Sequence, residues 1–456
     1  MAGMPVFMRW RRVALSAVPL AVAAMALPPA AAAGEFRLLL EGQAGMFSDG
    51  DYRGLDQDQA PLRNDDSRAR AGLNLQLSYA LERLNLAMAY GPSYERSLDN
   101  ADVSGLTHRL DFGLVGDLTR RLQLDVRERL LKTPDINLYA PVTTPETTTV
   151  TRRGDQLSHA LDVTLNHNFT RRASLLLGVS HSLRKFEEEN LIDSEALGAR
   201  IGAGFSFGSA QRVEAAAGLG RYDYKERGDA DVGTFGIAWS TDFWRSSHVR
   251  VEAGAFSVDS TERVRTIIVP DPADPADPEE EPTVRETVVQ DSAEGFRGSV
   301  QLSQERRFVR WALGLSHDVS PGAGLGRAVE ADNAFVGLSF PVGRRLELGL
   351  DGSGSRQNDL TSRDIDVLNG ASGDPDGDEL TEFAAGTARA SWTFAQAFRV
   401  EGGYSRVWQR SRVEAFGNLN YARYFLNLAF RLYQTGETPK EPESLGRPTD
   451  EASDDQ

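Results

Sequence analysis

Residues 157–185 alternate between apolar and polar side chains on both sides of a three-residue turn at 170–172. Leucine and valine take one parity and small or polar residues take the other, which indicates two strands with one apolar face each. Each arm has about 12 residues, whereas a strand of a soluble protein usually has ~5 to 6 and a membrane-crossing strand needs about 9 to 11. If the unit recurs along the chain, these hairpins are long enough to cross a membrane.

The unit does recur, and it predicts eighteen strands. They lie near 35–46, 67–80, 84–95, 105–117, 121–131, 154–169, 173–185, 195–208, 212–224, 231–243, 248–262, 293–305, 308–318, 330–341, 345–355, 382–394, 398–410 and 419–433. Short turns alternate with longer connections, of which 47–66, 132–153, 263–292 and 356–381 are the longest. An even number of strands with this alternation is typical of bacterial outer-membrane barrels. We therefore predict an all-β fold, a closed antiparallel transmembrane β-barrel of about 18 strands (range 16 to 18), with both of its ends on the periplasmic side.

The first 33 residues predict a secretory signal peptide. Three arginines precede the apolar run 13–27, and an alanine-rich site ends at residue 33. The run is shorter than the ~20 residues of a membrane helix and is interrupted by Pro19. The chain has no cysteine, so it offers neither a lipid anchor nor a disulfide framework. We predict three regions: the signal peptide 1–33, the barrel 34–433 and a disordered acidic periplasmic tail 434–456.

The two parities of the predicted strands differ in polarity. One carries leucine, valine and aromatic residues, which suit contact with lipid, while the other is small or polar. The charged residues predicted to face the lumen are Asp111, Asp125, Arg127, Arg129, Asp162, Arg200, Glu214, Arg250, Glu252, Arg297, Arg310, Glu347, Arg389, Arg399, Glu401 and Arg431. So many charges could not be buried in a dry core, because an unpaired buried charge is costly. A barrel of 16 to 18 strands leaves room for a water-filled channel.

Charge is also distributed by side. The segments 48–66, 271–294 and 358–382 are strongly acidic, whereas the short turns carry pairs such as Arg171 and Arg172. This distribution predicts an acidic outer mouth and a basic periplasmic rim. The alternative is that solvated loops carry charge only for solubility.

Residues 68–90 and 108–130 repeat a unit of strand, basic turn and strand. With this recurrent unit, the chain resembles the β-barrel porins that are encoded with bacterial exopolysaccharide export systems. The resemblance implies an outer-membrane protein of a Gram-negative bacterium that exports a polysaccharide together with a periplasmic copolymerase-type partner. One departure is the polar tail that follows the last predicted strand, where such barrels commonly end on an aromatic residue.

Two other functions remain open at this stage. A general or solute-selective diffusion porin would narrow its bore with an inward-folded loop, for which 132–153 and 263–292 are the candidates. The acidic segment 263–292 could then meet Arg250, Arg297 and Arg310. The second alternative is a barrel enzyme that modifies lipid, which loss of hydrolysis on mutating His181 would support.

No enzyme site is predicted. His159, His181, His248 and His317 each adjoin a serine, but neighbours on a strand point to opposite faces, so they form no dyad. We expect these histidines to be interfacial polar residues. Asp374, Asp376 and Asp378 form a weak candidate for a calcium site, because the glycine and the glutamate of a calcium loop are misplaced. No catalytic residue, cofactor or metal is otherwise expected, and the acidic chain offers no nucleic-acid surface.

Overall fold

The computed structural model describes most of the strand-forming chain. The residues described are 35–50, 53–54, 62–63, 66–98, 104–135, 153–187, 192–208, 210–225, 227–244, 246–268, 283–320, 328–359, 379–395, 397–411 and 419–435. The predicted signal peptide and nearly all of the predicted tail lie outside these residues, so both stay predictions. Within the described part, no helix is long and apolar enough to span a membrane.

Eighteen long strands form one sheet. Their bounds are β1 (Glu35–Gly50), β4 (Asp66–Leu81), β5 (Leu84–Ser97), β6 (Gly105–Thr119), β7 (Leu122–Asp135), β8 (Arg153–Asn168), β9 (Ala173–Phe186), β10 (Ser194–Phe207), β11 (Gln211–Tyr224), β12 (Gly228–Phe243), β13 (Ser247–Ile268), β14 (Thr283–Arg306), β15 (Val309–Ser320), β16 (Val329–Val342), β17 (Leu346–Asp359), β18 (Glu379–Ala395), β19 (Phe398–Ser411) and β20 (Leu419–Gln434). Two short strands, β2 (Arg53–Gly54) and β3 (Leu62–Arg63), pair with each other in the connection between β1 and β4.

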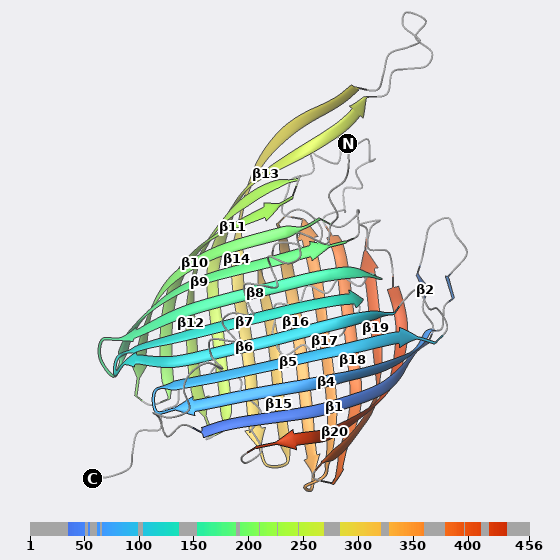
Figure 1. Cartoon of the computed structure of the whole chain (residues 1–456). Helices are drawn as coiled ribbons and strands as arrows, with labels where there is room; N and C mark the ends of the chain where they lie inside the picture. The colour runs from blue at the N-terminus through green and yellow to red at the C-terminus, as the bar shows by residue number, and fades with distance from the viewer. Residues whose placement is uncertain are drawn as a thin grey trace, which may run out of the picture.

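The sheet closes into a barrel because β1 pairs with β4 on one side and with β20 on the other. Every pairing in this sheet is antiparallel, and apart from the closing pair of β1 and β20 each joins consecutive long strands. The predicted architecture is therefore confirmed. Strands of the front wall cross those of the rear wall steeply (Figure 1), as expected for strands tilted against the barrel axis. The seam is extended by Leu38 and Thr435, whose backbone groups bond at 2.9 Å. The strand period thus continues slightly beyond the predicted end at residue 433.

The outer surface of the barrel is apolar. Leu177, Val179 and Ile201 are 43 to 54% exposed and share one parity through their pairing on β9 and β10. Large aromatic residues gather at the short turns: Phe169, Phe207, Trp244 and Phe308 are each more than half exposed. Two of these turns need a left-handed glycine, since φ is 72° at both Gly208 and Gly343. An apolar band ending in an aromatic girdle is the surface that a barrel presents to lipid.

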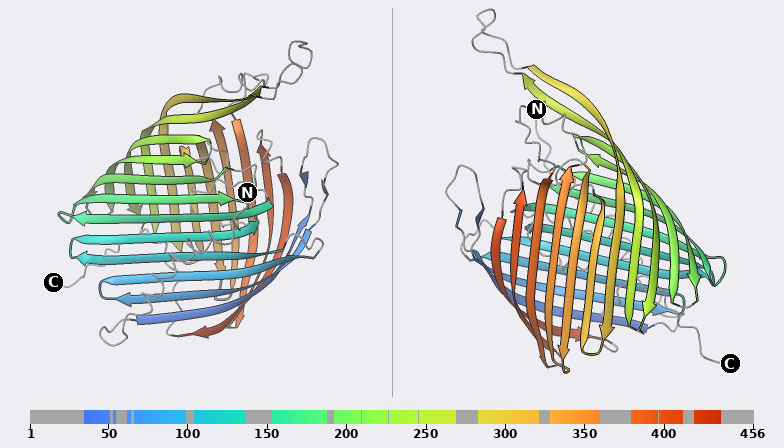
Figure 2. Two further views of the ribbon diagram at one scale, coloured as in Figure 1. Left: turned by 45° about the horizontal axis from the view of Figure 1, so that its top comes forward. Right: turned by 180° about the vertical axis from the view of Figure 1, so that it is seen from behind.

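The hairpin of β13 and β14 differs from the prediction. Its strands have 22 and 24 residues and pair continuously from Ser247 and Gln304 to Ile268 and Thr283. The predicted loop 263–292 is therefore largely strand in its described part, and this part rises beyond the barrel rim (Figures 1 and 2). It does not fold into the bore, because its backbone groups are already satisfied by the continued ladder.

Candidate functional site

The interior wall is formed by the parity opposite the exposed apolar residues. The pairing register places all sixteen predicted lumen-facing residues on this inner parity, as with Arg127 beside Asp162 and Gly349 beside Arg389. Most of them are half-exposed or exposed within the barrel.

Ion pairs between wall residues neutralise much of this charge. Arg127 pairs with Asp125 along β7 at 2.9 Å. Across β13, β14 and β15, Arg297 contacts Glu252 at 3.2 Å and Asp318 at 2.8 Å, while Arg250 lies 3.5 Å from Glu252. These pairs join charges of opposite sign on the same or neighbouring strands, so no ring of one sign forms in this part of the wall.

Further along the wall, Arg310 contacts Glu347 at 3.1 Å, and Ser339 donates to the same carboxylate at 2.7 Å. Arg389 lies 3.3 Å from Asp351. The wall itself thus supplies partners to Arg250, Arg297 and Arg310, which the sequence had offered to the acidic segment 263–292. For these arginines the loop-partner hypothesis is wrong in the described part of the chain.

Six predicted wall residues have no ion pair within the described chain. They are Arg129, Asp162, Arg200, Arg399, Glu401 and Arg431. Arg200 donates to Thr164 at 3.5 Å, and Arg212 lies 3.7 Å from Glu214. The residues without an ion pair include both arginines and acidic residues, so the wall carries charges of both signs there too.

The outer half of the inner wall is much less exposed than the rest. Inner-parity side chains there have very little exposed surface: Arg68 is 2%, Gln409 1% and Val407 0% exposed. The same holds on many strands around the barrel, with Phe47, Ser97, Thr107, Thr133, Ser194, Tyr224, Ala230, Val329, Gln357, Phe383 and Arg423 all buried. The accessible charged wall therefore gives way to a zone of buried inner side chains toward the rim of the long connections.

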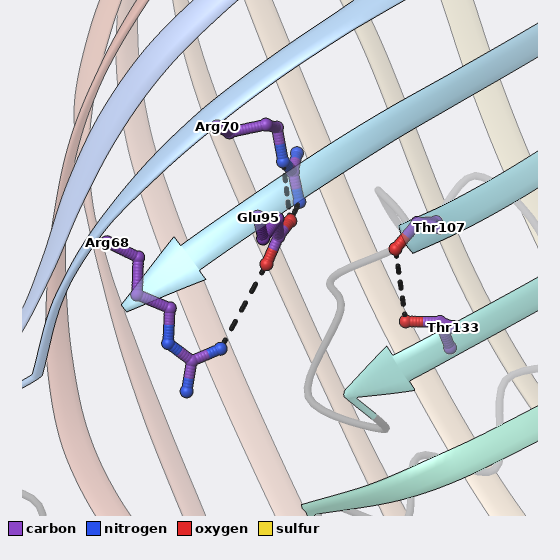
Figure 3. A network of polar contacts seen from close by, with 5 residues as sticks. All are labelled: Arg68, Arg70, Glu95, Thr107 and Thr133. Carbon is purple, nitrogen blue, oxygen red and sulfur yellow. Dashed lines mark hydrogen bonds and ion pairs between the residues drawn. The ribbon is translucent and has the colours of Figure 1, made fainter. Parts of the chain in front are cut away.

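A compact polar cluster lies in this zone of buried inner side chains. Arg70 of β4 donates to the Glu95 carboxylate of β5, and Arg68 reaches the same carboxylate at 4.0 Å (Figure 3). Thr107 and Thr133 are linked by a hydrogen bond of 3.5 Å. The guanidinium groups of Arg68, Arg70 and Arg423 lie 4.8 to 5.8 Å from the centre of the Phe47 ring. Cationic groups at this range are attracted to an aromatic face.

Sequence reasoning did not single out this cluster. The alternation of Arg68, Ala69 and Arg70 is the signal that could have placed both arginines on the inner face. Their meeting with Arg423 could not be found from local pattern, because β20 joins β1 only when the barrel closes.

Part of the inner face is also more apolar than predicted. Tyr224, Val232, Phe256 and Val258 of β11 to β13 are inner-parity residues that are 3 to 5% exposed and pack together with Ala328. The expectation of a small or polar inner face is therefore wrong here. Apolar side chains are favoured at this level because they meet one another rather than water.

The histidines show no serine partner in the described chain. His159 contacts Glu128 at 3.2 Å and His181 contacts Glu195 at 3.0 Å, both on the outward parity. His317 contacts Asp332 at 2.7 Å. Within the described residues, no group of three or more ligating side chains could hold a metal ion. The weak calcium candidate Asp374, Asp376 and Asp378 lies outside these residues.

Closed strands, an apolar outer belt and a charged inner wall define a class of protein. The chain is a transmembrane β-barrel, the architecture of outer-membrane proteins.

No family model and no curated protein matches the chain. Similar solved structures include OccAB1 of Acinetobacter baumannii, with 10% identity over 87% of this chain and 97% of that chain and a TM-score of 0.41. OccK2 (OpdF) of Pseudomonas aeruginosa has 11% identity over 87% and 98%, with a TM-score of 0.41. A BenF-like porin of Pseudomonas fluorescens Pf-5 has 8% identity over 87% and 99%, with the same score. At these identities the likeness concerns the general architecture alone.

Proposed function

We propose that this protein is a porin, a diffusion channel for small hydrophilic solutes. The observation that carries the proposal is the contrast along the bore. Charged side chains of the wall, such as Arg310 and Glu347 at 41 and 43% exposure, are accessible to water. Toward the rim of the long connections, inner-facing side chains such as Arg68 and Gln409 are buried. A wide wet section that leads to a constriction suits a solute of limited size.

The charge pattern supports a polar cargo without strong charge selection. Rings of one sign select ions, whereas pairs such as Arg297 with Glu252 and Asp318 present both signs together. A neutral or zwitterionic solute can exchange hydrogen bonds along such a wall. No single deep well holds the solute, because neighbouring groups compete for it.

Polysaccharide export, with its periplasmic copolymerase-type partner, was favoured by the sequence resemblance. A folded polymer would need a continuous wide bore. The buried inner side chains near the rim do not support such a bore. The lipid-modifying alternative lacks support as well, because the His181 imidazole contacts Glu195 and no serine contact accompanies it in the described chain.

Liposome swelling with sugars of increasing length tests the proposal. Proteoliposomes of the full-length protein should admit monosaccharides and exclude long oligosaccharides. A barrel that conducts in planar bilayers but shows no size cut-off would favour export of a polymer. A barrel with no conductance and no swelling would contradict both channel functions.

A further inference from the structure

A concave groove crosses the outer face of the barrel between β13 and β19. Its volume is about 690 Å³. Most of its lining side chains belong to the outward parity, among them Phe296, Val300, Leu315, Ala334, Gly354 and Trp408. The right-hand view of Figure 2 looks onto this wall, where the yellow to red strands stand in front. Because the groove faces away from the bore, the proposed channel function does not account for it.

The groove has an apolar body and a polar outer edge. Gly354 and Ala334 are neighbours on β17 and β16, and their small side chains leave a shallow hollow in the apolar body of the groove. Two positions nearer the rim, Arg356 lies beside Asp332 and beside Glu382 of the next strand. His317 bonds to Asp332 at 2.7 Å and stacks on Phe296 at 6.3 Å. The boundary between lipid tails and headgroups is where such a change of polarity is expected.

Two arginines flank Trp408 on β19, and one of them, Arg410, is in register with Glu382 of the polar edge. Arg406 and Arg410 are exposed, share the outward parity of Trp408 and have no ion pair within the described chain. Just below them, Tyr404 and Tyr424 pack with ring centres 5.1 Å apart. Guanidinium groups match phosphate oxygens in geometry and charge. Aromatic rings at this depth mark the membrane interface.

We propose that the groove binds one phosphorylated lipid of the outer leaflet. Its acyl chains occupy the apolar body between Phe296 and Trp408, and its phosphate lies against Arg406 and Arg410. A second copy of the chain is a poorer occupant, since two such walls facing each other would bring like arginines together. Charge complementarity and the neighbouring aromatic pair Tyr404 and Tyr424 both favour the lipid.

Native mass spectrometry of the full-length protein in detergent tests this site, with diphosphorylated lipid A as the probe. The wild type should retain one lipid, and a fully dephosphorylated form should bind at least tenfold more weakly. The double variant R406Q/R410Q should lose this preference for phosphate. Gly354→Leu should weaken the binding of both forms of the lipid by at least tenfold. A Cβ at residue 354 would meet its nearest neighbour, the Phe383 carbonyl oxygen, at 3.5 Å, so the leucine fills the groove without a backbone clash.

Arg96→Gln is the matched control. Arg96 is an exposed outward residue of β5, away from the groove, and it has no ion pair within the described chain. Lipid retention should be unchanged in this variant, and all variants should show the gel migration of a folded barrel. If Arg96→Gln weakened lipid binding as much as R406Q/R410Q does, the effect would come from the overall charge of the protein, and the proposed site would be overturned. Undiminished binding to Gly354→Leu, or a dimer that lipid does not displace, would overturn it as well.

Discussion

Two adjacent residues of β8, Asp162 and Val163, face opposite sides of the wall. Val163 lies between Val126 and Val179 on the outward parity, whereas Asp162 is exposed on the inner parity. Val163→Arg should cost about 2 to 4 kcal/mol of folding free energy, because the charge would enter the lipid band. Asp162→Arg should cost much less, since its side chain meets water. Urea titration of both variants refolded in lipid vesicles gives the comparison, and equal losses would show that the two faces are wrongly assigned.

The buried carboxylate of Glu95 offers a second test at the residue scale. Arg68 and Glu95 have side chains that are 2 and 4% exposed, so Glu95→Ala should destabilise the barrel by about 3 to 5 kcal/mol, the usual cost of removing one member of a buried pair. Glu347→Ala is the control, because the pair with Arg310 is more than 40% exposed and its loss should cost under about 1 kcal/mol. Similar effects in the two variants would mean that the outer interior is as wet as the rest of the wall.

Single residues also show where sequence reasoning stops. Period two suffices to place Arg127, Arg297 or Glu401 on the inner face, because a strand has only two faces. It does not say what lies across the bore from them. Phe47 and Arg423 meet through barrel closure, and the burial of Gln409 or Val407 depends on whatever packs against the inner wall. The side of the strand on which a residue lies was therefore predictable, whereas the exposure of its side chain to solvent was not.

At the scale of elements, the alternation of apolar and polar residues predicts the number of strands correctly but predicts their lengths less well. β13 and β14 extend past the prediction into residues with charged side chains such as Arg263 and Asp291. In a sequence, charged residues of this kind predict a loop. In the structure they are tolerated because this two-stranded ribbon rises beyond the barrel rim (Figure 1), where both of its faces can be polar.

The outer part of this hairpin should be dispensable for assembly. The ladder of β12 with β13 ends at Gly228 and Glu262, and that of β14 with β15 at Gly298 and His317, so the pairs beyond Val289 have no flanking strand. Deleting 263–288 and joining Glu262 to Val289 through Asn-Gly, a favoured two-residue turn, should leave the heat-modifiable gel migration of the barrel intact. Single-channel conductance should also stay the same. A marked rise in conductance would show that the deleted segment obstructs the bore.

At the scale of the whole molecule, ion preference should arise outside the wall. The described wall is mixed in sign, whereas the outer connections 48–66, 271–294 and 358–382 are strongly acidic. A cation excess near the mouth should therefore give a weak cation preference at low salt. Exposed charges act over roughly 10 Å at 0.1 M salt and about 3 Å at 1 M, so the preference should fade as the salt concentration rises.

Reversal potentials across planar bilayers measure this preference. Replacing the six acidic residues of 271–282 with their amides should shift the low-salt reversal potential toward zero and leave the high-salt value unchanged. Arg310→Gln is the matched change in the wall, where the partner Glu347 would remain. Because this residue lies inside the bore, its effect should persist at high salt, where charges at the mouth are screened. Strong anion selectivity that survives 1 M salt would locate the selecting charges in the wall instead, among arginines such as Arg129 and Arg399 that have no ion pair in the described chain.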